Sequence, residues 1–113
     1  MKSLLALLVL ITSAVATAQS GREEIEIVFD RNKGKLYAEY VQALRQHPGL
    51  AGKVELDIDI ARTGAVTDCR VRSRTLPDAD LPKRLCERIR EIKFPPRAEP
   101  TTVPKTIDFF PAA

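Results

Sequence analysis

One segment alternates strictly between apolar and charged side chains, and it limits what the rest of the chain can form. In KVELDIDIA, residues 53–61, the residues at every second position are apolar: Val54, Leu56, Ile58 and Ile60. The positions between them carry Glu55, Asp57 and Asp59. This alternation is typical of a β-strand with one buried and one solvated face. The other segments must therefore supply more strands and a cover for the apolar face.

A second strand is predicted over residues 65–73, antiparallel to the first. Arg62-Thr63-Gly64 forms the turn between them, and Gly64 suits a left-handed backbone conformation. Arg70 and Arg72 share the solvated face, where we expect them to pair with the acidic side chains of the first strand. A cation site on that acidic face is the alternative to this pairing.

The other face of the second strand carries Cys69 and Val71. Val66 has the wrong parity to join them. It is either exposed or turned inward by a β-bulge near Thr67–Asp68, and we favour the bulge.

Two helices are predicted. The first begins at Ser20, which forms a capping-box pattern with Glu23, and it ends before Pro48 and Gly49. Gly34 weakens its middle and allows a kink. Its apolar residues recur at helical spacing: Ile25, Val28, Phe29, Leu36, Tyr40, Val41 and Leu44.

The second helix is predicted over residues 79–92, with Asp78 or Asp80 as its cap and Pro82 in its first turn. Its apolar stripe consists of Leu81, Leu85, Ile89 and Ile92. The last strand covers residues 102–110. Pro104 removes a hydrogen-bond donor from it, which favours an edge position.

The order helix, strand, strand, helix, strand predicts an α+β domain. A right-handed crossover through the second helix places the last strand beside the first. The result is a three-stranded antiparallel sheet in the order 2-1-3, with two helices packed on one face and the last strand as a free edge.

The first twenty residues, MKSLLALLVLITSAVATAQS, have the pattern of a secretory signal peptide. Lys2 precedes an apolar run, and Ala16-Thr17-Ala18 fits a cleavage site after Ala18. An uncleaved membrane anchor is the alternative, but spanning requires about 20 apolar residues and this run is shorter. We therefore predict a cleaved signal over residues 1–18 and one domain over 19–113, without a membrane anchor, in the periplasm or secreted.

The charge of the chain excludes one class of partner. Loss of Lys2 with the signal leaves 17 basic and 15 acidic side chains, too balanced to indicate nucleic-acid binding. Basic residues do gather on the second strand and second helix, interrupted by acidic ones. A polyanion site there is the alternative to an ordinary charged surface, which we favour.

Residues 23–110 resemble the C-terminal domain of TonB-like energy transducers, in the branch shared with gliding-motility proteins. The resemblance rests on FDRNKGKLY, ALRQHPGLAGKV, the hairpin with Gly64 and Val66, TDCRV, IREIKFPP and TIDFF. It implies a periplasmic domain without catalytic residues or cofactors. It also implies binding of an extended segment of a receptor as an added strand. We expect the chain to have neither the membrane helix nor the Pro-rich spacer of those transducers, so the resemblance supports fold and binding mode rather than energy transduction.

The two cysteines, Cys69 and Cys86, are predicted to form a disulfide. Cys69 points toward the helices, and Cys86 lies beside the apolar stripe of the second helix. Two buried free thiols are the alternative. A Cys nucleophile would need a base, and His47 is the only histidine, without a recognisable motif. The same three residues do not make a metal site at compatible spacing.

The candidate binding site is the free edge of the last strand: Thr102, Val103, Lys105, Thr106, Ile107 and Phe109. Such edges bind extended peptides through main-chain hydrogen bonds. We predict a non-enzymatic binding module for an extended segment of an envelope protein, or for a second copy of itself. An edge merely blunted by Pro104 and Lys105 is one alternative. A secreted inhibitor or accessory subunit of an envelope enzyme, acting through the hairpin loop around Thr63, is another.

Overall fold

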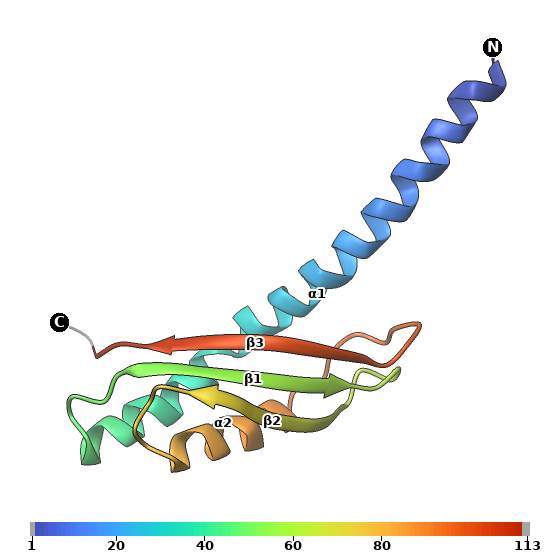
Figure 1. Ribbon diagram of the computed structural model, residues 1–113. Helices are drawn as coiled ribbons and strands as arrows, with labels where there is room; N and C mark the ends of the chain where they lie inside the picture. The colour runs from blue at the N-terminus through green and yellow to red at the C-terminus, as the bar shows by residue number, and fades with distance from the viewer. Residues whose placement is uncertain (1, 112–113) are drawn as a thin grey trace. The chain divides into compact units, whose positions relative to one another are not determined.

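The structure is a computed structural model, which describes the backbone of residues 2–111 and the side chains of residues 21–111. Its elements are helix α1 (Lys2–Gln46), strand β1 (Gly52–Ile60), strand β2 (Val66–Arg74), helix α2 (Asp80–Arg90) and strand β3 (Thr101–Phe109). Figure 1 shows them coloured along the chain. The chain divides after Arg31 into two compact units, and everything from Asn32 onward belongs to the second.

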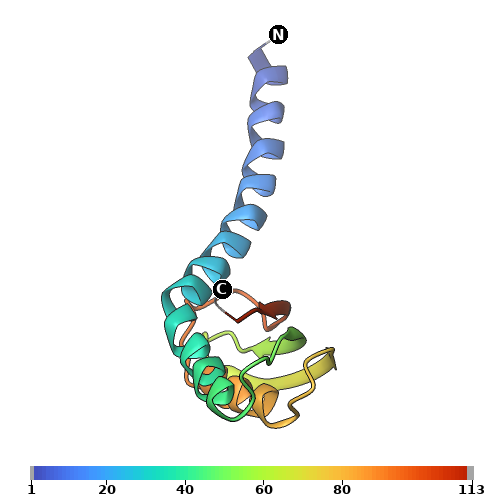
Figure 2. The ribbon, with the colours of Figure 1, turned by 90° about the vertical axis from the view of Figure 1, so that its left-hand side faces the viewer.

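The sheet has the order β2-β1-β3, and both pairs of neighbours are antiparallel. In the view along the strands, α2 and the last turns of α1 lie on the same side of the sheet (Figure 2). The predicted α+β class and the sheet order 2-1-3 are confirmed. The sheet is open, so within residues 2–111 β2 and β3 each have one side without a neighbouring strand.

The core lies between the sheet and the helices, where the apolar face predicted for β1 packs against the apolar faces predicted for the helices. All four alternating residues of β1 and the predicted apolar stripe, whose last member lies just beyond the end of α2, are buried: Val54, Leu56, Ile58, Ile60, Leu81, Leu85, Ile89 and Ile92. Tyr40 of α1 is fully buried, and its hydroxyl donates to the carbonyl oxygen of Leu50 at 2.6 Å. A buried hydroxyl without such a partner would destabilise the fold.

Helix α1 differs from the prediction at its start. It begins at Lys2 and runs without interruption through Ser20, so Ser20 and Glu23 do not cap it. The apolar run before Ser20 is rich in leucine and alanine, which have high helix propensity and extend the helix. Gly34 does not break the helix, and it ends at Gln46, just before Pro48, as predicted.

Strand β2 carries two β-bulges, of which one was predicted. Asp59 pairs with Asp68 and Ile60 with Val66, so Thr67 is the extra residue. This bulge turns Val66 inward, where it is half-buried. The second bulge, at Arg72, was not predicted. Val71, on the apolar face, is 41% exposed.

The hairpin turn is held by the segment that follows α2. Gly64 has a φ of 91°, in the left-handed region that glycine tolerates. Its carbonyl oxygen accepts a hydrogen bond from the Phe94 N–H at 2.9 Å. A Cβ atom at position 64 would clash with the backbone of Phe94, so glycine is required for this close approach.

Helix α2 begins at Asp80, and Asp78 caps it. The Oδ1 atom of Asp78 accepts hydrogen bonds from the N–H groups of Asp80 at 2.8 Å and Leu81 at 3.4 Å. These bonds satisfy donors that a helix N-terminus leaves free. Pro82 lies in the first turn, as predicted, and is buried.

Candidate functional site: the open edge of β3

The backbone groups of β3 alternate between β1 and the open side, and β1 shows which residues face which way. The carbonyl oxygen of Lys53 accepts a hydrogen bond from Thr75 N–H at 2.9 Å, so the backbone of Lys53 faces the β2 side. Successive residues of a strand alternate, so Val54 faces β3. Val54 pairs with Ile107, and odd-numbered residues of β3 therefore bond to β1. The open side receives the backbone groups of Thr102, Pro104, Thr106 and Asp108.

The direction of the backbone groups divides the six residues that the sequence predicts for the binding edge into two sets. Thr102 and Thr106 direct their N–H groups to the open side. The other four bond to β1 through their backbone: Val103, Lys105, Ile107 and Phe109. Their side chains lie on the helix-facing side of the sheet, where Phe109 is buried and the rest are half-buried. Asp108 is an open-side residue that sequence reasoning missed, although its spacing from Pro104 indicated the same parity.

Strand β3 is regular. All nine of its residues pair with β1 without a register shift. Within residues 2–111, no hydrogen bond occupies the open-side N–H groups of Thr102, Thr106 and Asp108. The Thr102 hydroxyl donates to Asp59 Oδ1 at 2.7 Å, which fastens the start of β3 to β1. Strand β3 is thus bonded to β1 on one side, and the N–H groups of Thr102, Thr106 and Asp108 are available on the other.

The opposite edge, β2, is irregular, and one of its outward carbonyl groups is occupied. The guanidinium of Arg90 on α2 donates to the carbonyl oxygen of Cys69 at 3.3 Å, and just before β2 begins, Lys93 forms an antiparallel bridge with Ala65. The bulges at Thr67 and Arg72 further interrupt the regular spacing that an added strand needs.

The predicted disulfide is present between Cys69 of β2 and Cys86 of α2. Their Cα atoms are 5.4 Å apart, and the two residues are 6% and 5% exposed. The bridge joins the sheet to the helix that covers it. With both sulfur atoms bonded, neither cysteine carries the free thiol that a nucleophile paired with His47 would require.

The solvated face of the sheet is a network of ion pairs. Arg70 Nη1 lies 2.6 Å from Asp59 and 2.7 Å from Asp68. Arg72 lies 3.5 Å from Glu55 and 3.7 Å from Asp57. The predicted pairing across the hairpin is confirmed. Among the described residues, no group of three or more metal-ligating side chains is placed to hold a metal ion.

These hydrogen bonds change the acidity of the carboxyl groups. The Arg70 guanidinium, with help from the Thr102 hydroxyl, lowers the pKa of Asp59 to about 2. Arg70 also lowers the pKa of Asp68. The Ser73 hydroxyl lowers the pKa of Glu55, with a smaller contribution from Arg72. The lowered pKa values keep Glu55, Asp59 and Asp68 ionised, with Asp59 and Asp68 directed at Arg70 of the same chain.

One buried carboxylate joins the helices. Glu39 of α1 is only 7% exposed, and its oxygens lie 2.9 Å from Arg88 Nε and 3.3 Å from Arg84 Nε on α2. The bond to Glu39 raises the pKa of Arg88. Arg90 in turn lies 3.4 Å from Asp68. Much of the basic cluster on α2 thus binds carboxylates within the fold, which favours the charged-surface interpretation over a polyanion site.

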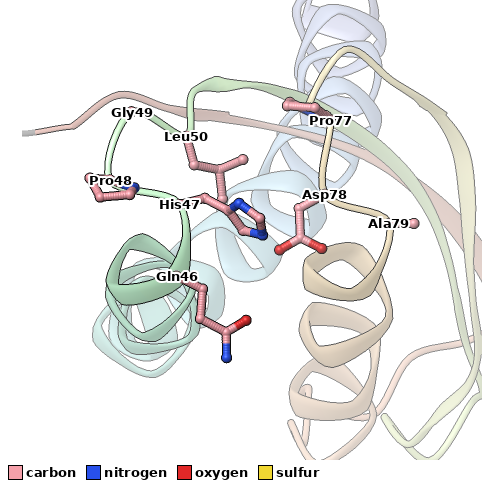
Figure 3. Close-up of a pocket in the computed structure, with 8 residues that line it drawn as sticks. All are labelled: Gln46, His47, Pro48, Gly49, Leu50, Pro77, Asp78 and Ala79. Atoms are coloured by element: carbon pink, nitrogen blue, oxygen red, sulfur yellow. The ribbon is translucent and has the colours of Figure 1, made fainter.

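A hollow of about 540 Å³ lies between the end of α1 and the start of α2. It is lined by Gln46, His47, Pro48, Gly49, Leu50, Pro77, Asp78 and Ala79. Figure 3 shows the His47 ring and the Asp78 carboxylate pointing into the space between the two segments. Asp78 already caps α2 through one oxygen, which gives it a structural role here.

The hairpin loop around Thr63 is exposed but fastened. Besides the bond between Phe94 and Gly64, the N–H of Arg97 donates to the carbonyl oxygen of Arg62 at 2.8 Å. These two hydrogen bonds hold the loop against the segment that follows α2.

Comparison with protein-family models, with curated proteins and with solved structures finds no match for this chain. In the part of the chain that the structure describes, no helix has an apolar stretch long enough to cross a membrane.

Proposed function

We propose that the chain is a non-enzymatic, TonB-like binding module of the cell envelope. It takes up an extended segment of a protein partner as a fourth strand beside β3. The sheet of the partner complex then has the order β2-β1-β3-partner. The main-chain groups of Thr102, Thr106 and Asp108 supply its hydrogen bonds.

The observation that carries this proposal is the difference between the two edge strands, β3 and β2. The nine residues of β3 pair regularly, and its outward N–H groups are unoccupied within the described residues, whereas β2 carries two bulges and has its Cys69 carbonyl bonded to Arg90. Edge strands left open are templates for pairing, and folds that do not use them tend to blunt them. Here β2 is interrupted by two bulges, whereas β3 is regular and its outward donors are interrupted at Pro104.

The sequence supports the setting of this activity. The signal-peptide pattern of residues 1–18 favours export to the periplasm or beyond, where disulfides persist. The bond between Cys69 and Cys86 is consistent with that setting. The resemblance of residues 23–110 to TonB C-terminal domains supports the binding mode.

Replacing Thr106 tests the proposal. Thr106→Pro removes one open-side N–H and leaves the bonds between β3 and β1 intact, because residue 106 faces away from β1. Thr106→Ala is the matched control, since it keeps the N–H. Both variants and the parent are used as bait in envelope extracts, and captured proteins are identified by mass spectrometry. Thermal unfolding confirms that each bait is folded.

The expected result is a partner that binds the parent and Thr106→Ala but not Thr106→Pro. Partners that bind all three baits equally would refute strand addition at β3. Light scattering on the purified chain separates the two kinds of partner. A dimer lost in Thr106→Pro would show that the added strand comes from a second copy.

A further inference from the structure

We infer that Tyr37 and Val41 of α1 form an apolar shelf beside the open edge of β3, and that the shelf selects the partner. The preferred partner is an extended segment with apolar side chains at alternate positions on one face and a basic residue on the other. This inference rests on the proposed function, because it describes the segment that β3 would receive.

The two residues are unusually exposed for their type. Tyr37 is 46% exposed and Val41 is 39% exposed, although both belong to the helix that covers the sheet. The sequence assigns Val41 to the buried stripe, and the structure corrects this. Tyr37 and Val41 are one turn apart, so their side chains lie on the same side of α1.

Helix geometry shows which flank this is. Residues advance by about 100° each, so Tyr37 and Val41 both lie about 160° around the axis from Glu39. Glu39 faces α2, to which it is bound through Arg84 and Arg88. Helix α2 lies against β2 and is bonded to it by the disulfide. Tyr37 and Val41 therefore lie on the flank away from α2 and β2, toward the β3 side of the sheet.

Aromatic contacts connect this flank to β3 itself. The ring centroids of Tyr37 and Tyr40 are 5.8 Å apart, and those of Tyr40 and Phe109 are 4.7 Å apart. Phe109 is the last residue of β3. A strand added beside β3 would lie about 5 Å further out and direct alternate side chains to the helix side. At the Phe109 end those side chains meet the shelf, and apolar ones gain the most from contact with it.

The solvated face of β3 defines the other half of the pattern. Its side chains are Thr102, Pro104, Thr106 and Asp108, all exposed, and Asp108 is the only charged one. On the β1 side, Asp108 stands opposite Lys53. Residues opposite one another on a sheet face interact, and unlike charges are favoured. A Lys or Arg of the partner opposite Asp108 would repeat this arrangement on the open side.

The test uses a displayed library of random linear 12-residue peptides, with the complete folded chain as target. Enriched sequences are expected to alternate apolar and polar residues and to carry a basic residue on the polar side. Affinities of two or three synthetic peptides are then measured by fluorescence anisotropy. The double variant Tyr37→Ser, Val41→Ser is expected to weaken binding about tenfold, because the peptide loses its apolar contact. Both side chains are exposed, but Tyr37 contacts the Tyr40 ring, so the unfolding temperature of the variant should fall only slightly below that of the parent.

Gln42→Ser is the matched control, because Gln42 is exposed on α1 about 160° around the axis from Tyr40 and faces away from the sheet. It should bind as the parent does. Selection on Asp108→Lys should exchange the basic residue of the peptides for an acidic one.

The outcomes separate the two proposals. Peptides that lose affinity with Thr106→Pro and with the shelf variant support both. Peptides that respond to Thr106→Pro but not to the shelf variant, and that show no alternation, overturn the inference and leave strand addition standing. Enrichment that survives Thr106→Pro, or no enrichment at all, overturns both.

Discussion

Within residues 2–111, the two edge strands of the sheet each lack a neighbouring strand on one side. They differ in the regularity of their pairing and in their side-chain contacts. Strand β2 has two bulges, a disulfide to α2 and a guanidinium from Arg90 on its outward carbonyl. Strand β3 pairs regularly over all nine residues, and the Thr102 hydroxyl donates to Asp59 of β1. The difference is that β2 is irregular and attached to the neighbouring helix, whereas β3 is regular and attached to β1.

The same contrast runs through the helix layer. The flank of α1 that faces α2 holds the buried Glu39 between two arginines. The opposite flank holds the exposed Tyr37 and Val41. Within the last turns of α1, the bonds that fix the fold therefore lie on the flank toward α2, and the exposed apolar side chains lie on the other flank.

The largest expected effect comes from removing the disulfide. Replacing Cys69 and Cys86 by alanine should lower the free energy of unfolding by roughly 3 kcal/mol, since the bridge restricts a loop of the unfolded chain. Urea denaturation of the oxidised parent and the double variant measures it. Hydrogen exchange should then show β2 opening as readily as β3. A loss below about 1 kcal/mol would mean that the β2 side does not depend on its cross-link.

A smaller loss is expected for Glu39→Gln. The substitution removes the charge between Arg84 and Arg88 and should cost about 1–2 kcal/mol, less than a fully buried ion pair because both arginines are partly exposed. The urea midpoint measures the loss. Tyr37→Ser on the opposite flank is the comparison, and its midpoint should move much less. Equal shifts would contradict the division of α1 into a structural and an exposed flank.

The smallest effect concerns pH. Bonding to Arg70 lowers the pKa of Asp59 from 3.8 to about 2 in the folded protein. A depressed carboxyl pKa stabilises the fold above the unfolded value, and this contribution disappears as the pH falls from about 4 to about 2. Urea midpoints of the parent should therefore fall over this range more steeply than those of Asp59→Asn. Parallel curves would show that Asp59 does not contribute to acid sensitivity.

Much of the fold follows from patterns that act over short distances. The alternation around Leu56 predicted β1 and its buried face, and the stripe around Leu85 predicted α2. The parity of Val66 predicted the bulge at Thr67, and Cys69 facing the helices predicted the disulfide. The strand and the helix follow from periodicity along the chain, and the bulge and the disulfide follow from which face of the strand that periodicity gives to Val66 and Cys69.

What the sequence did not predict depends on contacts between distant segments. The bulge at Arg72, the burial of Glu39 and the cover that Arg90 gives β2 all require knowing how α2 lies against the sheet. Val41 fits the helical period but lies beyond the area that the sheet covers. The orientation of the β3 backbone follows from its register with β1, which periodicity alone does not determine.

Pro104 has a consequence for how long a partner stays. It stands among the outward residues of β3 and has no N–H, so it separates Thr102 from Thr106 and Asp108. An added strand finds only two neighbouring donors at the Phe109 end. Differences in affinity between related complexes arise mainly from dissociation rates, and a short ladder of bonds dissociates quickly. If β3 receives a partner, Pro104 makes the residence time brief, which suits a contact that is formed and released repeatedly.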